Sequence, residues 1–180
     1  MNHIFTTTVI PSLLVAMLTA FLIWLARKKD IAALREQADQ LKVFFSIIEQ
    51  VRSTIELTDL DGNIQYVNPR FTETTGYTFE EVKGKKPSVL KSGDTSSEEY
   101  RVLWETISLG GVWRGRFHNR KKNGDLYWEQ AQIFPLTDTN GKTIFYAALK
   151  EDITQQVLAE EKLDESEEHY RLLFENSMDA

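Results

Sequence analysis

The sequence predicts an α+β fold in which a five-stranded antiparallel sheet is covered on one face by helices. The first observation is a change of hydrophobic period near residue 53, from a helical pattern to the alternation typical of strands. The second is a set of three turn pairs that favour tight hairpins, Asp61-Gly62, Asn123-Gly124 and Asn140-Gly141. The third is a block of helical sequence that separates the first two strands from the last three.

The first hairpin consists of the strand-like runs "STIELTD" and "NIQYVN", joined at Asp61-Gly62. Two short helices are predicted to follow it. Pro69 can begin the first of them and Gly76 can end it. Thr78 and Glu81 have the spacing of a capping box at the start of the second.

A longer helix is predicted over residues 95–109, with Ser96 or Ser97 as its N-cap. Three strands and two hairpins then complete the sheet. Asp152 ends the last strand and can cap a new helix over residues 153–166. Because this exit helix is highly charged and has few apolar residues, we interpret it as a signalling linker.

The amino-terminal residues 4–26 contain no charged side chain and are long enough for a bilayer core of roughly 30 Å. The basic cluster Arg27-Lys28-Lys29 follows, which favours a cytoplasmic location for this end of the segment. The pattern predicts a single-pass transmembrane helix in a bacterial-type inner (cytoplasmic) membrane, with the folded domain in the cytoplasm. A cleaved signal peptide is the alternative, but no positive charge precedes the segment and no cleavage pattern follows it.

Residues 27–52 have the a/d spacing of a coiled coil. Apolar residues recur there in steps of three and four, at Ile31, Leu34, Ala38, Leu41, Phe45 and Ile48. The pattern predicts a parallel homodimer through this linker. The alternative is an amphipathic helix that packs on its own domain.

Composition excludes several classes of function. The net charge of -6 and the lack of a basic stripe argue against nucleic-acid binding. The absence of cysteine excludes disulfides, thiolate metal sites and a light-driven cysteinyl adduct. The sequence has no glycine-rich phosphate loop, no cluster of metal ligands and no paired nucleophile and base. We therefore predict no catalytic and no metal-binding residue in these 180 residues.

Four stretches, taken in order, resemble PAS domains: "LTDLDGNIQYVN", "FTETTGYTFEEVKGK", "NRKKNGDLYW" and "KEDIT". The resemblance covers about residues 43–155 and implies a PAS sensor domain at residues 53–152. Residues 167–180, "EEHYRLLFENSMDA", resemble the truncated start of a second PAS domain.

The stretch "LWETISLGGVWRGRFHNRKKNGDLYW" resembles the PAS subgroup that binds flavin adenine dinucleotide (FAD) and senses redox state or oxygen, as in aerotaxis receptors and nitrogen-fixation regulators. The resemblance implies that Trp104 and Asn119 lie against the isoalloxazine ring, and that Trp113 matches a second family tryptophan. In the related light-sensing flavin domains, asparagines occupy the positions of Asn119 and Glu129, and a glutamine that of Lys150. The glutamate and lysine found here depart from that pattern.

Strand alternation places Trp113, Gly115, Phe117 and Asn119 on the covered face of one strand. A buried amide needs hydrogen-bond partners, and the edge of a flavin pyrimidine offers adjacent C=O and N–H groups. Gly115 is expected to leave room for the ring. The alternative is that Asn119 bonds to backbone or water beside an empty pocket.

Glu129 and Lys150 are expected nearly opposite one another on the last two strands, as a partly buried ion pair beside the pocket. The alternative is a surface salt bridge of little energetic value. The predicted FAD-binding residues are Trp104, Trp113, Phe117, Asn119, Glu129 and Lys150.

Together these observations predict a membrane-anchored sensory module that passes the state of a bound flavin through the exit helix to a downstream C-terminal output domain or a partner kinase. The alternatives are a ligand-free dimerisation or interaction module, or the amino-terminal part of a histidine kinase or of a cyclic-di-GMP synthase or phosphodiesterase.

Overall fold

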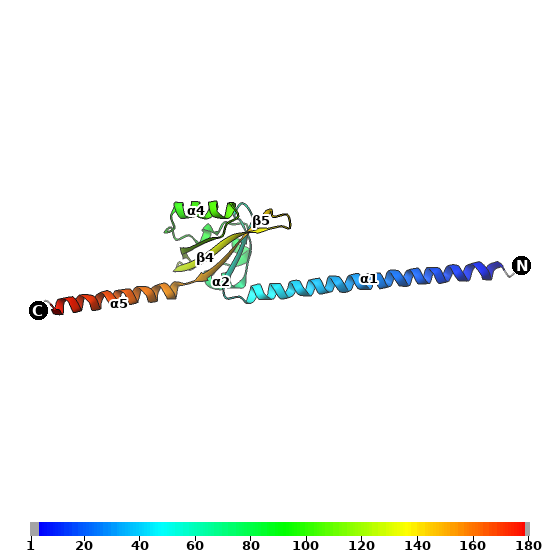
Figure 1. The fold of residues 1–180 in the computed structure, drawn as a ribbon, viewed down its shortest axis with the longest axis horizontal. Coiled ribbons are helices and arrows are strands. Elements are labelled where there is room, and N and C mark those ends of the chain that lie inside the picture. The colour runs from blue at the N-terminus through cyan, green and yellow to red at the C-terminus, as the bar shows by residue number, and fades with distance from the viewer. Residues whose placement is uncertain (1–3, 179–180) are drawn as a thin grey trace. The chain divides into compact units, whose positions relative to one another are not determined.

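The computed structural model describes the backbone of residues 4–178 and the side chains of residues 15–171 (Figure 1). The chain divides into two compact units, residues 1–47 and 48–180, which are described separately. Helix α1 (Ile4–Gln50) is continuous through the segment predicted as a membrane span and through most of the predicted linker. In the linker, Ile31, Leu34 and Phe45 are each at least half exposed on the single chain.

The predicted transmembrane helix, and with it the membrane localisation, is wrong. In the part of the chain that the structure describes, no helix combines the length and the apolar character that crossing a bilayer requires. The side chains of residues 4–14, where the predicted span begins, lie outside the described residues.

The second unit contains a five-stranded antiparallel sheet, as the sequence predicts (Figure 1). Its strands lie in the order β2-β1-β5-β4-β3. Strands β1 (Thr54–Thr58) and β2 (Ile64–Val67) form the first hairpin. Strands β3 (Trp113–Arg120), β4 (Leu126–Thr137) and β5 (Thr143–Asp152) follow the helices. The central strand β5 pairs with both β1 and β4, so residues from both halves of the sequence meet on its two sides.

The predicted turn pairs are confirmed by the backbone angles of their glycines. Gly62 has φ of 82°, Gly124 of 98° and Gly141 of 79°. An L residue with a Cβ rarely adopts this left-handed region, which is why glycine follows Asp or Asn at each of these turns.

Three helices and a 3₁₀ turn form the block between β2 and β3: α2 (Pro69–Thr75), α3 (Phe79–Val82), η1 (Pro87–Leu90) and α4 (Ser97–Ser108). The predicted capping box of Thr78 with Glu81 is present. Ser96, one of the two predicted N-caps of the longer helix, caps α4 and forms a second capping box with Glu99. Gly76 ends α2 in the left-handed conformation, as predicted.

Asn68 fixes the start of the domain and was not singled out from the sequence. It is 1% exposed and caps α2. Its side-chain oxygen accepts hydrogen bonds from the backbone of Ile55 and Phe71, and its nitrogen donates to the carbonyls of Ile48 and Ser53. One amide thus ties the first strand to the first short helix.

Two apolar clusters form the core between the sheet and the helices. The first contains Ile64, Val67, Phe71, Val82 and Leu90, from β2, α2, α3 and η1. The second contains Leu103, Ile107, Phe117 and Ala131, from α4, β3 and β4. Helices therefore cover one face of the sheet, and the cavity described below lies beside the second cluster.

Helix α5 (Thr154–Met178) begins directly after β5. The carboxylate of Asp152 accepts hydrogen bonds from the backbone N–H and the hydroxyl of Thr154, which confirms the predicted cap. The helix continues through residue 166, where the sequence predicted a boundary. The predicted second PAS domain falls largely on residues 172–180, whose side chains lie outside the described residues, and it stays a prediction.

Candidate ligand-binding site

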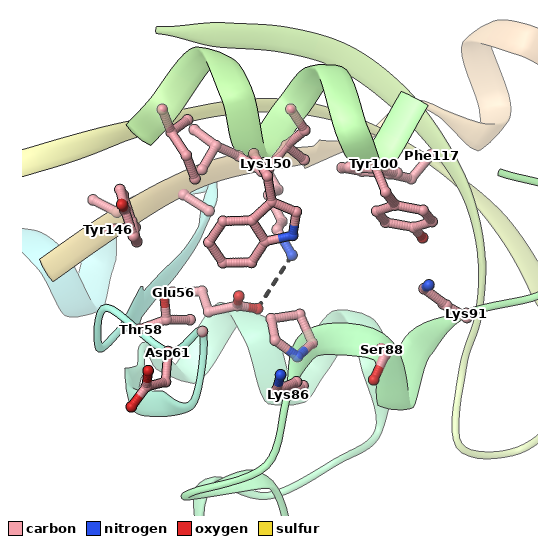
Figure 2. A pocket seen from close by; sticks show the side chains of 18 of the residues that line it. Glu56, Thr58, Asp61, Lys86, Ser88, Lys91, Tyr100, Phe117, Tyr146 and Lys150 are labelled. Carbon is pink, nitrogen blue, oxygen red and sulfur yellow. Dashed lines mark hydrogen bonds and ion pairs between the residues drawn. The ribbon is translucent and has the colours of Figure 1, made fainter. Parts of the chain in front are cut away.

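A cavity of about 470 Å³ lies between α4, the β1–β2 turn, η1 and the covered face of the sheet. Its walls are aromatic, with Tyr100 and Trp104 from α4, Phe117 from β3 and Tyr146 from β5. Figure 2 shows Tyr146 at one end of the cavity and Tyr100 with Phe117 at the other. Volumes of roughly 300–1,000 Å³ with mostly apolar walls are typical of small-molecule sites.

Trp104 closes one side of the cavity against the first hairpin. Its ring lies edge-on to Tyr146, with centroids 5.8 Å apart. A Cβ added at Gly62 would lie 3.0 Å from the same indole. Gly62 therefore serves both the tight turn and the close approach of Trp104.

The cavity wall has a polar patch where Glu56 and Lys150 line it, and these two meet a third buried charged residue, Glu129, behind the lining. Glu56 on β1, Glu129 on β4 and Lys150 on β5 are 3%, 1% and 4% exposed. The ammonium of Lys150 lies 3.1 Å from a carboxylate oxygen of Glu56 and 3.7 Å from one of Glu129. The shorter contact is the dashed line in Figure 2.

The predicted ion pair between Glu129 and Lys150 is thus present, but the predicted register is wrong. Lys150 is directly opposite Ala131, and Glu129 is opposite Asp152. The two side chains meet diagonally across the strands, within reach because long side chains span such offsets. The register shift in this pair of strands lies between Leu136 and Thr137, close to the turn.

Glu56 was missed in the sequence. In "TIELT" the apolar residues Ile55 and Leu57 would normally be expected to face the core, yet Thr54, Glu56 and Thr58 are the buried residues of β1. The available signal lies in β1 itself, where Thr54, Glu56 and Thr58 alternate with apolar residues and can present a polar face to the core.

The charge balance of this cluster governs its titration. Burial raises the pKa of the Glu129 carboxyl above its ordinary value, against the opposing effect of Lys150. Burial disfavours the charged form of Lys150, but the two carboxylates outweigh this effect and its pKa is also raised. One ammonium is therefore shared by two buried carboxyl groups.

Asn119, the polar residue on the covered face of β3, is 6% exposed and lines the cavity. Its side-chain nitrogen donates a hydrogen bond of 3.0 Å to Glu129. The partner is a side chain on the adjacent strand.

Four of the six predicted site residues line the cavity, namely Trp104, Phe117, Asn119 and Lys150. Glu129 lies behind Asn119. Trp113 stacks on Phe117 with centroids 5.0 Å apart, outside the cavity lining. The interpretation of Gly115 is wrong, because a Cβ there would lie 2.3 Å from the Trp113 ring. The missing side chain at Gly115 makes room for Trp113.

The basic residues at the cavity come from the helical block. Lys86 and Lys91 line it, and the ammonium of Lys91 lies 3.7 Å from the centre of the Tyr100 ring. By strand alternation Arg114, Arg116 and His118 lie on the opposite face of the sheet, where His118 stacks on Trp128.

Comparison with known proteins agrees with this architecture. Residues 52–155 match the profile of a family described as "PAS domain". The chain is 34% identical over 121 residues to a nitrogen fixation regulatory protein of Klebsiella oxytoca. The aligned region covers 67% of this chain and 24% of that protein. It is 31% identical over 102 residues to the aerotaxis receptor of Escherichia coli K12, and the aligned region covers 57% of this chain and 20% of that receptor. The chain thus spans about a quarter or less of the length of these relatives.

Two solved structures have a similar fold. One is an RNA-binding light-oxygen-voltage receptor, with a TM-score of 0.64 and 21% identity over 71% of this chain and 37% of that one. The other is a domain of a protein from Colwellia psychrerythraea, with a TM-score of 0.55 and 22% identity over 64% of this chain and 98% of that one. At these identities the likeness shows the fold alone.

Proposed function

This chain belongs to the PAS domain family, and on that premise we propose that it senses redox state or oxygen through a flavin held in the cavity beside α4. Its PAS domain is a sensory module of the kind found in signalling proteins. The observation that carries the proposal is the cavity itself, which has aromatic walls and a polar patch formed by Asn119, Glu56 and Lys150.

The residues fit a planar heteroaromatic ligand. Aromatic side chains on α4, β3 and β5 offer flat apolar surfaces to a ring system. Asn119 and Lys150 offer hydrogen-bonding groups to its polar edge. The mouth residues Lys86 and Lys91 suit the phosphates of a flavin nucleotide, which is why we propose FAD rather than riboflavin.

A bound flavin supplies a reversible change of oxidation state. The chain supplies the buried cluster of Glu56, Lys150 and Glu129, whose charges are poorly screened. Two unit charges about 6 Å apart interact by about 3 kcal/mol at an effective dielectric constant of about 20. An allosteric coupling of about 1–3 kcal/mol is enough to shift a two-state equilibrium.

The cluster is well placed to influence the exit helix. Lys150 lies two residues before Asp152, which caps α5. A shift of Lys150 between its two carboxylate partners would change the position of β5 relative to β1 and β4. We propose that α5 carries this change to an output domain and that α1 pairs with a second copy as a parallel coiled coil.

The test is an absorption spectrum of the purified 180-residue chain after incubation with excess FAD and removal of free ligand. Retained oxidised-flavin bands that bleach reversibly on reduction support the proposal. Asn119→Ala should retain less flavin, whereas the exposed turn residue change Asn140→Ala should retain as much as the wild type. A chain that stays colourless would rule out flavin sensing.

A further inference from the structure

Asn119 lies between the cavity and a buried carboxylate that the ligand cannot reach. Asn119 lines the cavity, while Glu129 is 1% exposed and is not part of the cavity lining. The two side chains meet diagonally, since Glu129 is opposite Phe117 and Asn119 is opposite Tyr127. Glu129 therefore makes no direct contact with a ligand in the cavity, and its hydrogen-bonding effect passes through its neighbours.

The contacts of Glu129 fix the orientation of the Asn119 amide. An asparagine carries donors on its nitrogen and an acceptor on its oxygen, whereas an ionised carboxylate only accepts. The nitrogen of Asn119 donates to a carboxylate oxygen of Glu129 at 3.0 Å. The ammonium of Lys150 lies 3.7 Å from the same oxygen and favours the ionised form of Glu129, which only accepts hydrogen bonds. The hydroxyl of Tyr127 donates to the other carboxylate oxygen of Glu129 at 3.4 Å.

Because the side-chain nitrogen of Asn119 donates to Glu129 on β4, the side-chain oxygen is the group that can accept a hydrogen bond from another partner. We propose that Glu129 is a positioning residue that makes Asn119 present an acceptor, its Oδ1, to the bound ligand. This inference rests on the proposed function and deepens it. The site selects a planar heteroaromatic ring with an N–H donor at its polar edge, such as the imide edge of a flavin, and rejects the same ring when that nitrogen is methylated.

The first arm of the test compares riboflavin with 3-methylriboflavin, which lacks the imide N–H, by fluorescence titration of the 180-residue chain. Leaving a buried acceptor unpaired costs about 1–3 kcal/mol, so the wild type should prefer riboflavin by roughly 5- to 150-fold. Equal affinities in the wild type would overturn the proposal without any variant.

Two substitutions separate positioning from general structure. Glu129→Leu removes the acceptor, frees the Asn119 amide to rotate, and should bring the ratio of the two affinities close to one. Glu129→Gln keeps an acceptor without the charge and should restore much of the preference. The exposed Glu161→Leu on α5 is the matched control and should behave as wild type. A full preference in a folded Glu129→Leu chain would contradict the proposal.

The second arm needs no ligand. In the nitrogen-15 spectrum of the wild-type chain, the Asn119 side-chain amide, assigned by its loss in Asn119→Asp, should exchange slowly with water. It should exchange at an ordinary rate in Glu129→Leu. If riboflavin does not bind but this protection is present and depends on Glu129, the flavin proposal fails and the positioning role stands. If the protection is absent, the positioning role fails whatever binds.

Discussion

Lys150→Met tests the energetic role of the buried cluster. The substitution keeps an unbranched side chain only one atom shorter and removes its charge, leaving the carboxyl groups of Glu56 and Glu129 without their shared ammonium. Removing one partner of a buried ion pair typically costs about 3–5 kcal/mol, because a charge is left buried and uncompensated. Natural domains have about 5–15 kcal/mol of stability, so the loss is a large share of the total.

The size of this loss should depend on pH. Burial already raises the pKa of Glu129, and loss of the nearby ammonium raises it further. A carboxyl group whose pKa is higher in the folded than in the unfolded state stabilises the protein at low pH. This contribution to the free energy of unfolding is lost as the pH rises through the pKa of the folded state. The difference between Lys150→Met and the wild type should therefore be smallest near pH 4–5, around the ordinary glutamate pKa of about 4.3, and largest near pH 8.

Urea denaturation followed by far-ultraviolet circular dichroism, repeated across that range of pH, measures this difference. Lys142→Met, at an exposed residue beside the β4–β5 turn, is the matched control and should change the free energy of unfolding by less than about 0.5 kcal/mol. A loss below about 1 kcal/mol at pH 8, or one that does not vary with pH, would refute the account of a buried and charged cluster.

Two further substitutions test the framework of the site. Asn68→Ala should destabilise the domain by roughly 2–4 kcal/mol in the same assay, because it removes a helix cap and leaves buried backbone groups without partners; an effect below about 0.5 kcal/mol would contradict this role. Gly62→Ala should cost more than Gly141→Ala, because both glycines have positive φ but only the Cβ at position 62 meets Trp104. Equal losses at the two glycines would show that Trp104 gives way freely.

Local features of the fold could be predicted because they depend on neighbouring residues. Asp61-Gly62 and the Thr78–Glu81 capping box are determined by backbone chemistry within a few residues, and both are confirmed. The order of elements along the chain, two strands, a helical block and three strands, followed from these signals. The location of Asn119 on the covered face followed from simple alternation.

The features that the sequence did not predict correctly depend on tertiary packing. Glu56 was missed because alternation alone does not tell which face of a strand is covered, and its apolar neighbours favoured the other face. The role of Gly115 was misassigned because it depends on the direction taken by the side chain of Trp113. The register between Glu129 and Lys150 depended on where a bulge falls, which the sequence does not specify.

Binding of a flavin beside α4 can be tested directly with the four tryptophans of the chain. Their indole N–H signals in a nitrogen-15 spectrum report on four separate places, and each can be assigned by substitution. On addition of FAD the signal of Trp104, which lines the cavity, should shift most, and that of Trp113, which packs on Phe117, should shift less. The signals of Trp24 in α1 and Trp128, which stacks on His118, should stay unchanged. Shifts at Trp24 or Trp128 without one at Trp104, or no shift at all, would contradict the account.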